Sequence, residues 1–137
     1  GGDLLDLGGD FVVPTPLDLD PSAAVTPQQF QQLWVSIEGG HTSRYSFPSG
    51  APPAHQVEGC LAAAGIRLMA TGAAGPGQRK SFFYCVPLGS QEVCMCEAVV
   101  DEGPGVMTCL YKAPGGDFAQ TRLALTFRAA LEGIGAQ

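Results

Sequence analysis

The residues best suited to chemistry are Cys94 and Cys96, which lie two positions apart. On a β-strand this spacing points both thiols to one face, where Cys85 or Cys109 from flanking strands could complete a zinc or copper site. The sequence contains no pair of CxxC motifs, and neither histidine lies near a cysteine. We therefore interpret the cysteines as buried reduced thiols in a reducing cytosol. A small cytosolic metal-binding or thiol-dependent enzyme using Cys94 and Cys96 is the alternative function.

A second candidate for chemistry is the segment 75–81, Gly-Pro-Gly-Gln-Arg-Lys-Ser, which superficially suggests a phosphate-binding loop. Its spacing is not that of GxxxxGK[ST], and the residues after it are typical of a strand rather than a helix. We interpret it as a turn. The two histidines lie in Gly/Pro-rich loops or at a helix start. They are too few to indicate a catalytic nucleophile with its general base. We expect no catalytic residue, metal or cofactor.

Composition and charge narrow the classes of protein to which the chain could belong. Of its 137 residues 45% are hydrophobic and 15% charged, which favours one folded domain. The net charge is −6, and the basic residues are scattered, so nucleic acid and anionic membranes are poor partners. No apolar run approaches the roughly 18 to 20 residues that a membrane span needs, so direct membrane insertion is not expected.

Two regions differ in their patterning. Residues 1–25 combine acidic, Gly and Pro residues without a sustained period, which is typical of a flexible linker. Residues 26–137 are expected to form the folded domain. There, Thr26 and Pro27 predict the start of an amphipathic helix, and the segment that opens with Pro52-Pro53 and ends at Gly65 predicts a second one.

Between and after these helices, alternating apolar residues separated by Gly, Pro and Ser turns predict strands. The expected strands cover residues 42–47, 66–71, 80–88, 92–100 and 106–112. A last helix is expected after residue 116, capped by Asp117, although Leu123, Leu125 and Phe127 also alternate as in a strand. We predict an α+β fold of order αβαββββα, with an antiparallel sheet of about five strands and helices packed on one face. The other face would then be bare.

Three segments in this order resemble the platform subdomain of the beta-adaptin appendage, a TBP-like fold at the C-terminal end of adaptor beta subunits. They are Phe30-Gln31-Gln32-Leu33-Trp34, then Val57 through Leu61 to Gly65-Ile66, and Thr108-Cys109-Leu110-Tyr111-Lys112-Ala113-Pro114 with the helix after it. The resemblance implies a non-enzymatic protein-interaction module of a coat adaptor in vesicle transport, joined to the other adaptor subunits through its parent chain.

The linker runs directly into the first platform helix, with no sandwich subdomain between them. In this respect the chain is similar to the beta subunit of the fourth adaptor complex. The clathrin-linked platforms have two aromatic residues in their binding groove, and the corresponding positions in this sequence are Val93 and either Gly105 or Val106. None of the binding residues of those platforms is therefore carried over to this chain. The similarity implies short hydrophobic motifs of a tepsin-like accessory protein as ligands. It also implies a cytoplasmic, peripheral location on trans-Golgi network and endosomal membranes.

A peptide-binding platform needs an exposed apolar patch on rigid elements. We predict that Met69, Phe82 and Tyr84 form this patch, with Ala70 at its lip, although each could equally be an ordinary core residue. Arg79 and Lys80 beside it could receive an acidic flank of the peptide.

The linker contains a second candidate motif. Leu4, Leu5 and Leu7, with Asp6 between them, resemble a clathrin box, but Gly8 stands where the motif has an acidic residue. This segment is the candidate for a weak interaction with clathrin.

Overall fold

The computed structural model describes residues 19, 20, 22–89 and 92–137. Within these residues the elements follow in the order αβαββββα, as predicted. The helices are α1 (Pro27–Ser36), α2 (Ala54–Ala63) and α3 (Asp117–Glu132), and the strands are β2 (His41–Ser46), β3 (Arg67–Gly75), β4 (Gln78–Cys85), β5 (Cys94–Asp101) and β6 (Val106–Lys112). The α+β class is confirmed.

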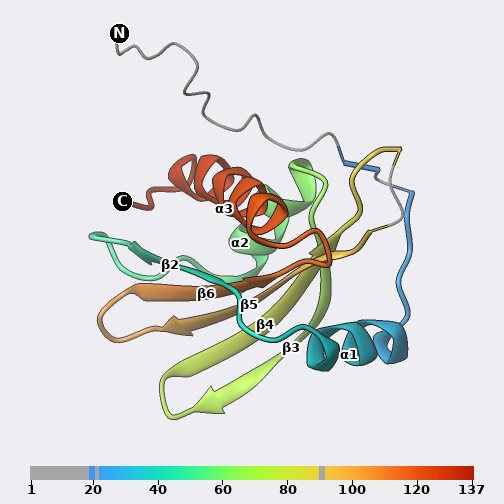
Figure 1. Cartoon of the computed structure of the whole chain (residues 1–137). Coiled ribbons are helices and arrows are strands. Elements are labelled where there is room, and N and C mark those ends of the chain that lie inside the picture. The colour runs from blue at the N-terminus through green and yellow to red at the C-terminus, as the bar shows by residue number, and fades with distance from the viewer. Residues whose placement is uncertain (1–18, 21, 90–91) are drawn as a thin grey trace, which may run out of the picture.

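The five strands form one antiparallel sheet in the order β2-β6-β5-β4-β3. Strands β3 to β6 are a simple meander, since each pairs with the next along the chain. Strand β2 pairs with β6, on the far side of the meander from β3 (Figure 1). The two edges of the sheet are therefore β2 and β3.

Helices α2 and α3 cover one face of the sheet and enclose the main core (Figure 1). Leu61 of α2 and Phe127 of α3 are fully buried there, as are Phe83 and Tyr111 from the sheet. No helix in the described part of the chain is long and apolar enough to cross a membrane.

Helix α1 lies on the opposite face, which corrects the expectation that all helices share one face. It buries Phe30 in a second apolar cluster with Tyr84 and Met95. The reason is the apolar run Phe82-Phe83-Tyr84-Cys85 in β4. Alternate side chains of a strand point to opposite faces, so this run makes both faces of the sheet apolar and both need cover.

The local signals at the helix ends explain where the helices start. At α1 the predicted cap is confirmed: the Thr26 hydroxyl accepts from the Gln29 backbone N–H at 3.1 Å, and the Gln29 side chain accepts from the Thr26 N–H at 3.0 Å. Residues 123–127 are helical rather than extended. The N-cap of α3 is Gly116 with φ +80°, without a side-chain capping bond, instead of the expected Asp117.

The segment before α1 contacts the fold. Leu19 packs against the main core, and a Cβ at Gly65 would lie 2.9 Å from the Leu19 Cβ. The Asp20 N–H donates to the Val86 carbonyl at 2.8 Å, and Arg67 donates to the Ala23 carbonyl at 2.6 Å. The sequence places these residues at the end of the linker 1–25, and the boundary at residue 26 stays a prediction.

Replacing Gly105 by alanine should destabilise the domain much more than replacing Gly77. Both glycines have a left-handed φ, +70° and +69°, so each alanine carries a backbone cost of about 1 kcal/mol. At Gly105 the new Cβ would also lie 2.8 Å from the Phe47 carbonyl oxygen, whereas Gly77 faces open space. We expect a total loss of about 3 kcal/mol at Gly105, measured by urea unfolding. Equal losses would mean that the contact with Phe47 relaxes freely.

Candidate functional site

An apolar pocket of about 370 Å³ opens between α1 and the β3–β4 hairpin. Its lining residues are Pro27, Phe30, Gln31, Trp34, Val35, Met69, Ala70 and Phe82. Gln31 is the one polar side chain among them. Val35, at the pocket, is 70% exposed, so part of this apolar surface is open to solvent.

Three aromatic rings form the rigid wall of this pocket. Phe30 and Trp34, one helical turn apart on α1, stack at 6.0 Å with an interplanar angle of 9°. Phe82 of β4 meets both rings edge-on, at 5.7 Å from Phe30 and 5.6 Å from Trp34. Such contacts hold the rings in place.

Lys112 on β6 fixes the C-terminal end of α1. Its ammonium donates to the Trp34 carbonyl at 3.0 Å and lies 4.5 Å from the centre of the Trp34 ring. A cation suits this position, because the carbonyls at the end of a helix carry partial negative charge. The helix is thereby held over the sheet, and the pocket is a preformed feature of the fold.

A β-bulge brings Met69 and Ala70 to the pocket together. Leu68 pairs with Phe83 and Ala70 pairs with Phe82, so Met69 is an extra residue on β3. In a regular strand Met69 and Ala70 would point to opposite faces. Because of the bulge, the side chains of Met69 and Ala70 both lie on the face of the sheet that α1 covers, next to Phe82.

Three of the four predicted peptide-binding residues, Met69, Ala70 and Phe82, therefore meet at one pocket. Tyr84 does not line it. Tyr84 is only 6% exposed, packs with Phe30 and Met95, and has the Arg67 guanidinium 6.0 Å from its ring centre. The expectation that Tyr84 is exposed is corrected, because α1 covers this part of the sheet.

Helix α1 contributes to the pocket in a way that the predicted site of Met69, Ala70, Phe82 and Tyr84 does not include. Phe30 and Trp34 belong to the amphipathic helix that the sequence predicts, and both line the pocket. Their i, i+4 spacing on a short helix was the available signal. The predicted clathrin-box residues Leu4, Leu5 and Leu7 lie outside the described residues, and their role stays a prediction.

A second, larger hollow of about 620 Å³ lies on another side of α1. It is bounded by Asp20, Gln29 and Gln32 together with small or aliphatic residues such as Ala24 and Val93. It lacks aromatic side chains and is more polar than the first pocket. Apolar peptide side chains therefore fit the aromatic pocket better.

The cysteines lie in the main core rather than at either hollow. Cys94 and Cys96 share one face of β5, as predicted, and are 1% and 0% exposed. Burial and a hydrogen bond with Cys109 raise the pKa of the Cys96 thiol well above its ordinary value. A hydrogen bond with Cys94, together with burial, raises the pKa of Cys85. In the part of the chain that the structure describes, no cluster of three or more His, Cys, Asp or Glu residues could hold a metal.

A thiol titration should distinguish buried cysteines from a reactive one. We expect Cys60, which is half-buried, to react with a disulfide reagent at pH 8 in the native chain. The four buried cysteines should react only after denaturation, because the folded protein covers their thiols. Rapid reaction of Cys94 or Cys96 in the native state would contradict this expectation.

Comparison with known protein families agrees with this geometry. Residues 20–131 match the model of the beta2-adaptin appendage, C-terminal sub-domain, which covers most of the chain. The chain belongs to this family. A search of curated proteins finds no match. Family membership identifies the appendage domain as a non-enzymatic protein-interaction module of adaptor complexes in vesicle transport, peripherally associated with vesicle membranes. Nothing points to the metal-dependent or thiol-dependent alternative.

Proposed function

We propose that the appendage domain binds short hydrophobic motifs of accessory proteins in the aromatic pocket between α1 and the β3–β4 hairpin. The observation that carries the proposal is the partly exposed apolar lining, held rigid by the stacked and edge-on rings of Phe30, Trp34 and Phe82. A preformed aromatic pocket can accept an apolar side chain without first ordering itself, which lowers the cost of binding.

The parent protein is then an adaptor beta subunit of the kind found in the fourth adaptor complex, and the partner is a tepsin-like accessory protein. The sequence feature that supports this choice is the direct passage from the linker-like residues 1–25 into the first platform helix. The parent complex would act at trans-Golgi network and endosomal membranes. Weak individual contacts would gain strength because the complex concentrates several binding elements.

The experiment is a titration of overlapping 15-residue peptides that together cover tepsin. We expect at least one peptide to bind with a micromolar Kd, equivalent to about −8 kcal/mol. Amide and indole NMR shifts should then move at Met69, Ala70, Phe82 and Trp34. Shifts centred on Gln32 and Val93 would assign binding to the larger hollow instead. Absence of binding by every peptide would reject tepsin as the partner.

A further inference from the structure

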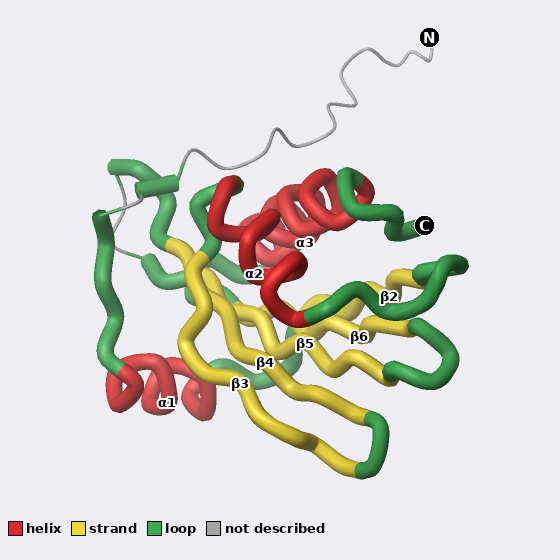
Figure 2. The backbone as a smooth tube through the Cα atoms, turned by 180° about the vertical axis from the view of Figure 1, so that it is seen from behind, coloured by secondary structure: helices red, strands yellow, loops and turns green. Residues whose placement is uncertain are grey.

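Within the described residues, the outer edge of β3 has no strand paired to it. In the described residues β3 pairs only with β4, and no other backbone hydrogen bond reaches it. Residues 68–75, Leu-Met-Ala-Thr-Gly-Ala-Ala-Gly, include neither a charged residue nor a proline, two of the devices that block strand addition. Figure 2 shows β3 as the outermost strand, with its hairpin extending away from α2 and α3.

The opposite edge differs in two of these respects, since it carries a charged residue and its end is hydrogen-bonded. Strand β2 has six residues and carries the exposed Arg44. Its end is occupied by the chain's own main chain: the Ser46 N–H donates to the Gln137 carbonyl at 3.1 Å, and the Gln137 N–H donates to the Ser46 carbonyl at 2.9 Å. The exposed edge is therefore specific to β3, the strand that borders the aromatic pocket.

The middle of β3 can accept another strand. Bulges interrupt its register between Leu68 and Ala70 and between Ala73 and Gly75, and residues 70–73 between them pair regularly with β4. On the α1 side this stretch presents Ala70, opposite Phe82, and Gly72, opposite Lys80. A Cβ added to Gly72 would meet nothing within 4 Å. Side chains of an added strand could therefore lie over these small residues and reach the pocket.

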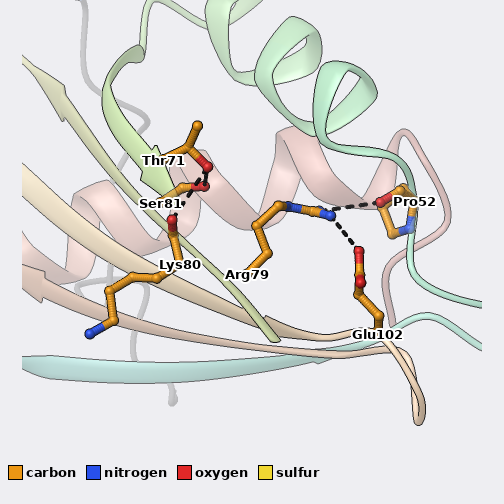
Figure 3. Close-up of polar contacts among 6 residues, drawn as sticks. All are labelled: Pro52, Thr71, Arg79, Lys80, Ser81 and Glu102. Carbon is orange, nitrogen blue, oxygen red and sulfur yellow. Dashed lines mark hydrogen bonds and ion pairs between the residues drawn. The ribbon is translucent and has the colours of Figure 1, made fainter. Parts of the chain in front are cut away.

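Charge indicates what kind of segment fits this edge. Residues 67–85 contain Arg67, Arg79 and Lys80 and no acidic residue, in a chain whose net charge is −6. Arg79 is already used, because it donates to Glu102 at 2.7 Å and to the Pro52 carbonyl at 3.4 Å. The side chain of Lys80 is 41% exposed, with its ammonium 3.5 Å from Glu97. Figure 3 shows it pointing away from Arg79.

We propose that the ligand of the pocket binds as an extra strand along residues 70–73 of β3. One large apolar side chain enters the aromatic pocket opposite Ala70, and a carboxylate two residues away lies opposite Gly72, beside Lys80. This binding mode rests on the proposed function, since it concerns the same pocket. The partner is thus an extended apolar segment that includes an acidic residue, whereas a second copy of the basic hairpin would be repelled.

The probe is a set of 12-residue peptides, selected from a random library by binding to the whole chain. Only peptides that bind the Phe82→Ala variant more weakly are kept. Each peptide is then N-methylated at one backbone position at a time. We expect losses of about tenfold at alternate positions and little change between them, because every second N–H of an added strand faces β3. The free amides of residues 70–73 should also gain protection from hydrogen exchange.

The contact with Lys80 is tested by a double-mutant cycle between Lys80→Gln and the peptide variant in which the acidic residue becomes its amide. Each change alone should weaken binding about fivefold, and both together should weaken it hardly more. Arg44→Gln, on the other edge strand, is the matched control and should leave the affinity unchanged.

Each remaining outcome counts against strand addition. Pocket-dependent peptides with no alternation in the N-methyl series, or with helical structure when bound, would overturn it and leave the proposed function standing. Failure to select any pocket-dependent peptide would overturn both. The β3 amides could instead be protected from hydrogen exchange already in the free chain. Protection that rises with protein concentration would assign the edge to a second copy, and protection independent of concentration would assign it to residues 1–18.

Discussion

Replacing Phe82 by alanine should weaken the binding of a pocket peptide about 30-fold, which corresponds to about 2 kcal/mol. Phe82 meets both aromatic rings of α1 edge-on, and it is also the register partner of Ala70. Its removal would open one wall of the pocket and leave Trp34 without its aromatic partner on the sheet. Isothermal titration with the best-binding peptide measures the effect.

The control is Leu88→Ala. Leu88 is 64% exposed and lies outside the pocket lining, so its loss should change neither the affinity nor the fold. Because Phe82 is only half-buried, the free energy of unfolding of Phe82→Ala should fall by roughly 2 kcal/mol, less than for a fully buried ring. Affinity that survives Phe82→Ala in a folded domain would exclude the aromatic pocket as the binding site.

Replacing Phe127 by alanine should lower the free energy of unfolding by about 4 kcal/mol, a large share of the 5 to 15 kcal/mol typical of a domain. Phe127 is fully buried and meets Phe83 of β4 and Tyr111 of β6 edge-on, at 5.9 and 5.3 Å. These contacts fasten α3 to the sheet. Removal of the ring therefore leaves a cavity where the two layers join, and urea unfolding measures its cost.

Arg128→Ala is the matched control, since Arg128 is the next residue of α3 and is exposed. Its effect should stay within about 0.5 kcal/mol. Phe127→Leu fills most of the space and should lose less than half as much as the alanine variant. If Phe127→Ala loses no more stability than Arg128→Ala, then α3 is not held by this ring.

Much of the architecture could be predicted from the sequence because its signals are local. The capping box of Thr26 and Gln29, the Gly/Pro turns and the alternation within each strand depend on residues close together in the chain. The pairing of consecutive strands in β3 to β6 followed from the short turns between them. The helix at residues 123–127 could likewise be predicted, because apolar residues in the longer segment around them recur with helical spacing.

The face on which α1 packs could not be predicted in this way. Phe82-Phe83-Tyr84-Cys85 is apolar on both faces of the strand, and no local signal says which helix covers which face. The placement depends on contacts distant in sequence, such as Lys112 with the Trp34 carbonyl and Phe30 with Phe82. Because α1 packs on this face, Tyr84 is buried and Phe30 and Trp34 line the pocket.

The sequence by itself determined the class of fold and the order of its elements, and it pointed to Met69, Ala70 and Phe82 as residues of the candidate site. The tertiary structure alone decided that these three residues meet on one side of the sheet. A single extra residue in β3 reverses the alternation after Met69, and such a bulge is visible only once the strand is paired with β4. The shape of the site is thus set by register, a property of two strands together.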